Sequence, residues 1–194
     1  MKTVDFYFDL SSPYSYLAAT QVPALAARHG ADVRWKPMVL AAVFKAADNH
    51  MPAQSPPKAR YMLHDLDRWA KKYGVPFKMS SRFPMNTVKP ERLVIAAEPT
   101  GLAPKLAQEL FHAMWVDDRD IASDLEMRAC AMAVGLDADG LLAAIDTPEV
   151  KNKLRAYTDE AIALEAFGAP TFVYEGKLYW GNDRMEFLED ALRG

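Results

Sequence analysis

The amino-acid sequence predicts an α/β fold in which both ends combine strands with helices and the middle is almost entirely helical. The N-terminal end runs strand, helix, strand, which is the pattern of a β-α-β unit with a parallel strand pair. The C-terminal end carries two strand-like runs joined by a short glycine turn and followed by a helix, a β-β-α unit. Between them, apolar residues recur at helical spacing and glycines mark the breaks.

The N-terminal unit begins with an aromatic-rich apolar run over 4–10, which predicts a buried strand. Ser12 is a good N-cap and Pro13 suits the first position of a helix, so a helix is expected to start there. Gly30 supplies the residue that ends it. The run 32–37 then alternates in the manner of a second strand.

The middle of the chain is expected to begin with a loop-rich connector over 41–55. A helix is predicted from the proline pair 56–57 to Gly74, followed by an irregular stretch over 79–86. Further helical patterns cover 88–98, 103–115, 123–134 and 137–146.

The C-terminal unit follows an amphipathic helix that starts at Pro148. The runs 171–174 and 177–180 predict a hairpin, because a glycine-containing pair separates them. A terminal helix is expected after the segment 181–184.

The β-α-β and β-β-α halves together match a thioredoxin-like fold interrupted by a large all-helical insertion. We therefore expect a thioredoxin-like domain made of residues 1–55 and 148–194, and a helical insertion domain made of residues 56–147.

The composition is that of an ordinary soluble globular protein. The chain has 194 residues, 51% of them hydrophobic, and a net charge of −3, so it lacks the basic surplus of a nucleic-acid-binding protein. An acidic residue at Asp5 comes too early for a signal-peptide core, and no apolar run is long enough for a membrane span. We expect a cytoplasmic protein without nucleic-acid or membrane partners.

Cys130 is the single cysteine, which excludes an intrachain disulfide and a zinc-type cysteine cluster. The four histidines show no ligand spacing, so no metal site is expected. The cysteine count also argues against a disulfide oxidoreductase, because that chemistry needs two thiols.

The strand-to-helix junction Ser12-Pro13-Tyr14-Ser15 is the most informative stretch for function. Thioredoxin-like redox proteins place a Cys-x-x-Cys pair at such a junction. A hydroxyl at a helix N-terminus cannot exchange disulfides, but it can donate a hydrogen bond to a thiolate from another molecule. The alternative is that Ser12 is merely an N-cap.

Five short motifs, in this order along essentially the whole chain, resemble the DsbA-like kappa-class glutathione transferases. They are Phe6-Tyr7-Phe8-Asp9 with Ser12-Pro13-Tyr14-Ser15-Tyr16-Leu17, then Asp67-Arg68-Trp69-Ala70, Met85-Asn86-Thr87, Phe167-Gly168-Ala169-Pro170-Thr171 and Trp180-Gly181-Asn182-Asp183-Arg184. The third and fifth motifs favour the glutathione-dependent isomerases of aromatic degradation over the broader transferases.

The resemblance implies that glutathione is the cofactor and that Ser12 is the catalytic residue at its sulfur. Ala169 and Pro170 resemble a cis-proline loop whose backbone would pair with the cysteinyl part of glutathione; a trans proline starting a strand is the alternative. Asn182 and Asp183 would hold the γ-glutamyl end, or simply cap a helix.

Asn49 and Lys58 match family positions that contact glutathione, with Lys58 at the glycine carboxylate, although both could lie in a solvated loop. The implied substrate is a small aromatic 2-oxo acid, whose carboxylate needs a cation. Four side chains are candidates for this cation, and the sequence does not favour one over another: Lys36, Lys45, Lys78 and Arg82.

Other side chains could meet the substrate, and we take Lys45, Asn86 and Trp180 as its contacts. Aromatic side chains could wall its pocket or belong to the core, namely Tyr14, Phe44, Trp115 and Trp180.

The expected reaction is an isomerisation in which a thiolate adds to a conjugated double bond, the bond rotates, and elimination returns glutathione unchanged. The resemblance also implies a homodimer. Two other classes stay open: a kappa-class transferase that consumes glutathione, and a non-catalytic thiol-binding or chaperone-like protein.

Overall fold

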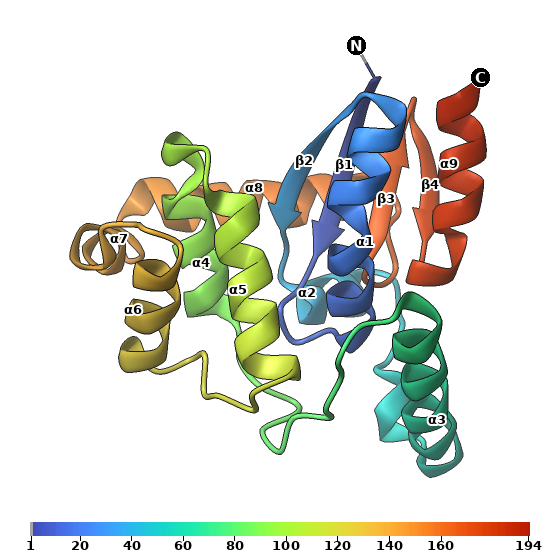
Figure 1. The fold of residues 1–194 in the computed structure, drawn as a ribbon, viewed down its shortest axis with the longest axis horizontal. Coiled ribbons are helices and arrows are strands. Elements are labelled where there is room, and N and C mark those ends of the chain that lie inside the picture. Colours follow the sequence, from blue (N-terminus) through green and yellow to red (C-terminus); the bar gives the residue numbers. More distant parts are fainter. Residues whose placement is uncertain (1) are drawn as a thin grey trace.

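Over residues 2–194, which the computed structural model describes, four strands form one sheet in the order β2-β1-β3-β4 (Figure 1). The central strand β1 pairs in parallel with β2 and antiparallel with β3, and β3 and β4 form an antiparallel hairpin. This topology confirms the predicted β-α-β and β-β-α halves. The strands are β1 (Lys2–Phe8), β2 (Ala31–Pro37), β3 (Thr171–Tyr174) and β4 (Lys177–Trp180).

The helical segments agree closely with the predicted ones, with one exception. They are α1 (Pro13–His29), α2 (Leu40–Ala46), η1 (Pro52–Gln54), α3 (Pro56–Tyr73), α4 (Val88–Ala96), η2 (Glu98–Thr100), α5 (Ala103–Trp115), α6 (Asp124–Ala133), α7 (Ala138–Ala144), α8 (Pro148–Ala163), η3 (Asn182–Arg184) and α9 (Met185–Arg193).

The exception is the connector over 41–55, whose predicted loop-rich character is wrong in its first half. The helix α2 occupies that part and packs on α8. At seven residues it spans only about two turns, too few for a clear helical pattern in the sequence, and its N-cap Val39 makes no side-chain capping bond. Tertiary contact rather than local sequence therefore stabilises this helix.

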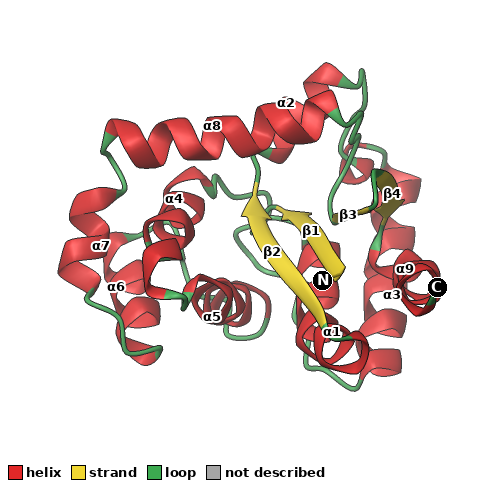
Figure 2. Ribbon diagram, turned by 90° about the horizontal axis from the view of Figure 1, so that it is seen from above, coloured by secondary structure: helices red, strands yellow, loops and turns green. Residues whose placement is uncertain are grey.

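Helices cover both faces of the sheet. Figure 2 shows α1 and α9 on one face and α2 and α8 on the other. The helix α3 contacts α1 and η1, while α4, α5, α6 and α7 form a group beside β2 (Figure 1). The division into a thioredoxin-like domain and a 56–147 insertion domain stays a prediction. None of the described helices is long and apolar enough to cross a membrane.

The central strand is buried on both faces, which explains its nearly continuous apolar sequence. On one face, Phe6 stacks on Phe172 with ring centroids 4.8 Å apart and meets Trp35 edge-on at 5.0 Å. On the other face, Tyr7 packs with Met38 and their neighbours in a separate apolar cluster. The end of β1 is thereby held rigidly between two layers.

Trp115, at the end of α5, ties the helical group to this strand end. It is fully buried, and its indole N–H donates to the carbonyl oxygen of Leu10 at 2.9 Å. Its ring stacks near Phe77 at 6.1 Å. The suggestion that Trp115 walls a ligand pocket is wrong, because the side chain belongs to the core.

Replacing Trp115 by Phe should lower the free energy of unfolding by about 2–4 kcal/mol, because it leaves a void and an unpaired buried carbonyl at Leu10. Urea unfolding measures this loss. Leu125→Ala, at a side chain 74% exposed, is the control and should change stability by less than about 0.5 kcal/mol. A Trp115→Phe protein as stable as that control would contradict the structural role.

Candidate active site

The candidate site is built around the turn that joins β1 to α1. The N–H of Ser12 donates to the carbonyl oxygen of Asp9 at 2.9 Å, and Ser12 is buried, with 5% of its surface exposed. Its Oγ atom accepts a hydrogen bond from the N–H of Ser15 at 3.1 Å. The predicted N-cap is therefore confirmed, and it places the hydroxyl at the positive end of a long helix.

A residue from the far end of the chain faces this hydroxyl. Ser12 Oγ donates to the carbonyl oxygen of Ala169 at 3.4 Å, longer than the usual O–H···O range. The hydroxyl proton is therefore weakly engaged and available to a better acceptor. The Ala169–Pro170 peptide bond is cis, as predicted. The N–H of Gly181 donates to the Pro170 carbonyl oxygen at 2.9 Å, which brings a third motif to the same place.

Trp180 lies across the loop that precedes the cis-proline. Its ring stacks on Phe167 with centroids 4.9 Å apart, and 46% of its surface is exposed. A Cβ atom at Gly168 would collide with the indole nitrogen of Trp180, so only glycine lets the ring lie there. An aromatic surface open to solvent thus lies beside the cis-proline loop.

Asn182 and Asp183 occupy different environments. Asn182 is buried, its amide donates to the Tyr73 hydroxyl at 3.4 Å, and that hydroxyl donates to the Asn182 carbonyl oxygen at 2.9 Å. Asp183 is exposed just before α9 and pairs with Arg184. A side chain at Gly181 would collide with the Asp183 carboxylate. Of the pair, Asp183 is the one that a ligand can reach.

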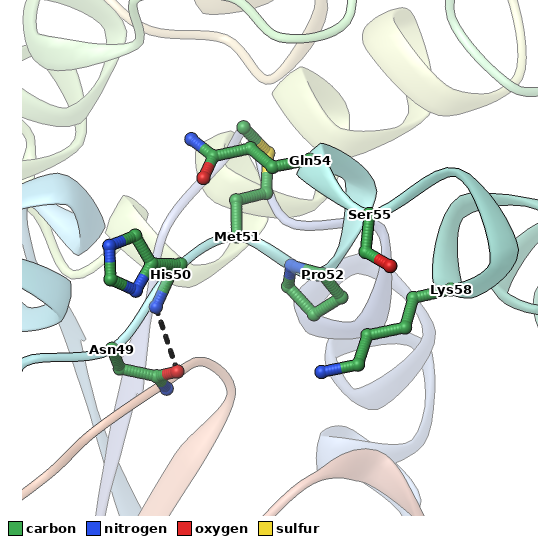
Figure 3. Close-up of a pocket in the computed structure, with 7 residues that line it drawn as sticks. All are labelled: Asn49, His50, Met51, Pro52, Gln54, Ser55 and Lys58. Carbon is green, nitrogen blue, oxygen red and sulfur yellow. Dashed lines mark hydrogen bonds between the residues drawn. The ribbon is translucent and has the colours of Figure 1, made fainter.

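Asn49 and Lys58 line a pocket of about 310 Å³ between α2 and α3 (Figure 3). Asn49 Nδ2 donates to the carbonyl oxygen of Phe167 at 2.8 Å, which ties the pocket to the cis-proline loop. Lys58 is exposed, and Figure 3 shows its amine reaching past Pro52 toward the side on which Asn49 lies. Among residues 2–194, no carboxylate pairs with Lys58, so its charge can serve an anion.

Three of the four cations considered for a substrate carboxylate are already engaged. Lys36 is buried and held by two carboxylates. Lys78 and Arg82 both pair with Asp118. Lys45 is exposed on α2 and forms no salt bridge with any described residue. The structure therefore separates Lys45 from the other three candidates, which the sequence alone does not rank.

Asn86 lies just before Thr87, the residue that precedes α4. Its Oδ1 accepts a hydrogen bond from the N–H of Val88 at 3.1 Å, and the residue is exposed. The adjacent Thr87 is buried and donates to Asp9 at 2.9 Å. The motif Met85-Asn86-Thr87 thus contacts the motif Phe6-Tyr7-Phe8-Asp9 at the end of β1.

Two residues of α3 that the sequence analysis missed, Asp65 and Tyr73, connect this helix to the site. Asp65 accepts a hydrogen bond from the Tyr14 hydroxyl at 2.9 Å. Burial, and then this hydrogen bond, raise the pKa of Tyr14, so its hydroxyl stays neutral. Tyr14 and Asp65 are 51 residues apart in the sequence, and Tyr73 and Asn182 are 109 residues apart. No local sequence pattern indicates hydrogen bonds between residues so distant.

The protein's own thiol takes no part in this arrangement. Cys130 is buried on α6, and burial raises the pKa of its thiol to about 11. Within the described residues, no group of three or more histidine, cysteine or acidic side chains is placed to hold a metal ion. Because Cys130 is buried on α6, any thiolate at Ser12 would have to come from another molecule.

Comparison with known proteins identifies the family. A DSBA-like thioredoxin domain matches residues 3–193. The 2-hydroxychromene-2-carboxylate isomerase of Sphingobium xenophagum is 35% identical over 193 residues, which cover 98% of each chain. Glutathione S-transferase kappa 1 of Rattus norvegicus is 30% identical over 201 residues, covering 96% of this chain and 89% of that protein.

A solved structure of 2-hydroxychromene-2-carboxylate isomerase has the same fold, with a TM-score of 0.91 and 27% identity over 98% of this chain and 94% of that one. The chain therefore belongs to the DsbA-like thioredoxin-domain family, in the group that contains the 2-hydroxychromene-2-carboxylate isomerases and the kappa-class glutathione transferases.

Proposed function

We propose that this protein is a glutathione-dependent isomerase that interconverts 2-hydroxychromene-2-carboxylate and trans-o-hydroxybenzylidenepyruvate, or a close aromatic analogue. The observation that carries the proposal is the weakly engaged hydroxyl of Ser12, placed between the N-terminus of α1 and the cis-proline loop. The relatedness to isomerases at 35% identity supports the reaction class.

The residues present fit glutathione by their chemistry. Glutathione is an extended peptide with a thiol, an amino group and two carboxylates. Ser12 offers a donor to the thiol, Ala169 and Pro170 offer a backbone edge, and Lys58 offers a cation to a carboxylate. The exposed carboxylate of Asp183 would meet the amino group.

The remaining contacts complete the proposed binding mode. Asn49 would help to hold the glycine end, since it lines the same pocket as Lys58. Asn182 would act from its buried position by fixing the backbone beside Asp183.

Bound glutathione would supply a thiolate that adds to the conjugated double bond of the substrate and later leaves, so that rotation can occur in between. Ser12 would favour the ionised sulfur, because its hydroxyl donates a hydrogen bond and α1 contributes its positive end. Free thiols have a pKa of about 8.5, and lowering that pKa by about 1.5 requires roughly 2 kcal/mol. One charge-assisted hydrogen bond and a helix terminus are sufficient for that.

The substrate would lie against the exposed face of Trp180, with its carboxylate at Lys45 and a polar contact from Asn86. The enzyme gains by positioning the reactants and by stabilising negative charge as it moves to the 2-oxo group. By likeness to the family, we extend the proposal to a cytoplasmic homodimer that acts in aromatic catabolism.

The proposal is tested by following the absorbance of 2-hydroxychromene-2-carboxylate as it equilibrates with the open form, with and without glutathione. The expected result is acceleration that requires glutathione and leaves its concentration unchanged. No acceleration in either case would reject the isomerase. A steady loss of glutathione would instead favour the second candidate, a kappa-class transferase, which the rat relative supports.

Ser12→Ala should lower kcat about 100-fold, because it removes the side-chain hydroxyl that we propose as the donor to the sulfur. It also removes the cap of α1, which costs about 1 kcal/mol of stability. Ser123→Ala is the matched control, since Ser123 caps α6 through the N–H of Glu126. It should show the same loss of stability with full activity. Equal activity of the two variants would show that Ser12 does not act at the glutathione sulfur.

Lys45→Gln should raise the KM for the aromatic acid about tenfold while the Kd for glutathione stays the same, because a charged contact to the substrate carboxylate is lost. Lys78→Gln, which removes an exposed lysine already paired with Asp118, serves as the control and should change neither constant. A KM unchanged in Lys45→Gln would show that another cation holds the carboxylate.

A further inference from the structure

The carboxylate of Asp9 connects three segments at the end of β1. Its Oδ1 accepts hydrogen bonds from the N–H of Ser11 at 2.7 Å and from the hydroxyl of Thr87 at 2.9 Å. Its Oδ2 accepts one from the N–H of Leu40 at 2.9 Å. One side chain therefore fixes the turn that carries Ser12, the start of α2 and the start of α4.

A second carboxyl group lies behind the first. Glu91, one turn into α4, has no exposed surface, and its Oε1 lies 3.0 Å from the hydroxyl oxygen of Thr87. Its Oε2 is buried and has no hydrogen-bond partner among the described residues. The Thr87 hydroxyl thus lies between two carboxyl groups, Asp9 on one side and Glu91 on the other.

A single hydroxyl proton cannot serve two carboxylates. If Thr87 donates to Asp9, its contact with Glu91 is a hydrogen bond only when Glu91 is itself protonated and donates to the Thr87 oxygen. Two buried ionised carboxylates at this separation, without a cation, would also be very unfavourable. Burial is the main reason that the pKa of Glu91 lies well above its usual range, and the nearby Asp9 adds to it.

Burial also raises the pKa of Asp9, but hydrogen bonds from Leu40, Ser11, Glu91 and Thr87 oppose that rise. Glu91 has fewer donors, so the proton belongs on Glu91. Asp9 then keeps the negative charge, which its hydrogen-bond donors stabilise.

The surrounding elements do not neutralise the pair with a cation. The helix α4 packs on α5, α7, α8, η2 and β2, and no described cation lies within salt-bridge distance of Asp9 or Glu91. The salt bridges that the charged side chains there do form are with other partners. These pairs are Arg34 and Lys36 with Asp5, Lys36 with Glu160, Lys89 with Asp124, Lys153 with Glu98, Arg92 and Lys151 with Asp146, Arg119 with Glu109, and Arg128 with Asp139. Lys105 on α5 and Arg155 on α8 form no salt bridge with any described residue.

We propose that Glu91, Thr87 and Asp9 form a hydrogen-bond relay, neutral acid to hydroxyl to carboxylate, that positions the Ser11–Ser12 turn for thiolate binding. These are positioning residues, and this role rests on the proposed use of Ser12 in holding a thiol. The relay also keeps the charge behind the turn at one unit. A second negative charge there would oppose the negative charge that the site must hold at sulfur.

Infrared spectroscopy tests the protonation state without any ligand. The wild-type protein at neutral pH should show the C=O stretching band of a buried, protonated carboxylic acid, and Glu91→Gln should abolish it. Glu98→Gln is the matched control, because Glu98 accepts a hydrogen bond from Tyr157 outside the relay, and it should leave the band in place. Absence of the band in the wild type, or its persistence in Glu91→Gln, overturns the relay.

The positioning role is tested at Thr87 with two variants that differ in whether they keep the hydroxyl. Thr87→Val removes the hydroxyl and keeps the shape, whereas Thr87→Ser keeps the hydroxyl. The readout is the pKa of bound glutathione, titrated through the ultraviolet absorbance of its thiolate, together with kcat. Thr87→Val should move that pKa back toward the value of free glutathione and lower kcat about tenfold, since misplacing a catalytic group is costly. Thr87→Ser should keep both the lowered pKa of bound glutathione and kcat close to the wild-type values.

The proposed function and the positioning role of Thr87 can be contradicted separately. A wild-type protein that binds no glutathione overturns the proposed function and the positioning role with it, while the infrared band still tests the relay itself. The wild-type protein and Thr87→Val could instead lower the pKa of bound glutathione equally, with Thr87→Val less stable to heat. That result overturns the positioning role alone and means that Asp9, Thr87 and Glu91 only stabilise the fold.

Discussion

The carboxylate of Asp9 accepts hydrogen bonds from Ser11, Leu40 and Thr87 and so fixes the point at which β1 ends and α1 begins. The position of Ser12 depends on that point, because its N–H is bonded to the Asp9 carbonyl oxygen and its hydroxyl caps the helix that follows. A carboxylate buried in this way is stable only when its donors are all in place. The architecture around it, two apolar layers against a central strand, keeps those donors there.

The site retains the helix N-terminus of a thioredoxin-like fold and uses it without a cysteine. Ser12 holds its proton only loosely against Ala169, and the one thiol of the chain, Cys130, is buried with a raised pKa. A negative sulfur from a cofactor would complete the arrangement. Around it, Lys58 and Lys45 carry charges that no described carboxylate neutralises, as the proposed binding of an anionic peptide and an anionic substrate would require.

Local signals made much of the fold predictable. The caps at Ser12 and Gly30 and the hairpin turn act within a few residues, so their sequence patterns are read directly. The short helix α2 was missed because packing on α8 stabilises it, and bonds such as Tyr73 with Asn182 join residues 109 apart. Lys36 could not be distinguished from Lys45 by sequence, since its burial among carboxylates exists only in the folded chain.

The central claim is that Ser12 holds the sulfur of a bound thiol. A crystal structure of the protein with glutathione tests it most directly. The account predicts the sulfur within hydrogen-bond distance of Ser12 Oγ, the hydroxyl turned away from the Ala169 carbonyl oxygen, and the peptide alongside the loop that holds Pro170. Glutathione bound with its sulfur remote from Ser12, and the Ser12–Ala169 hydrogen bond intact, would contradict it.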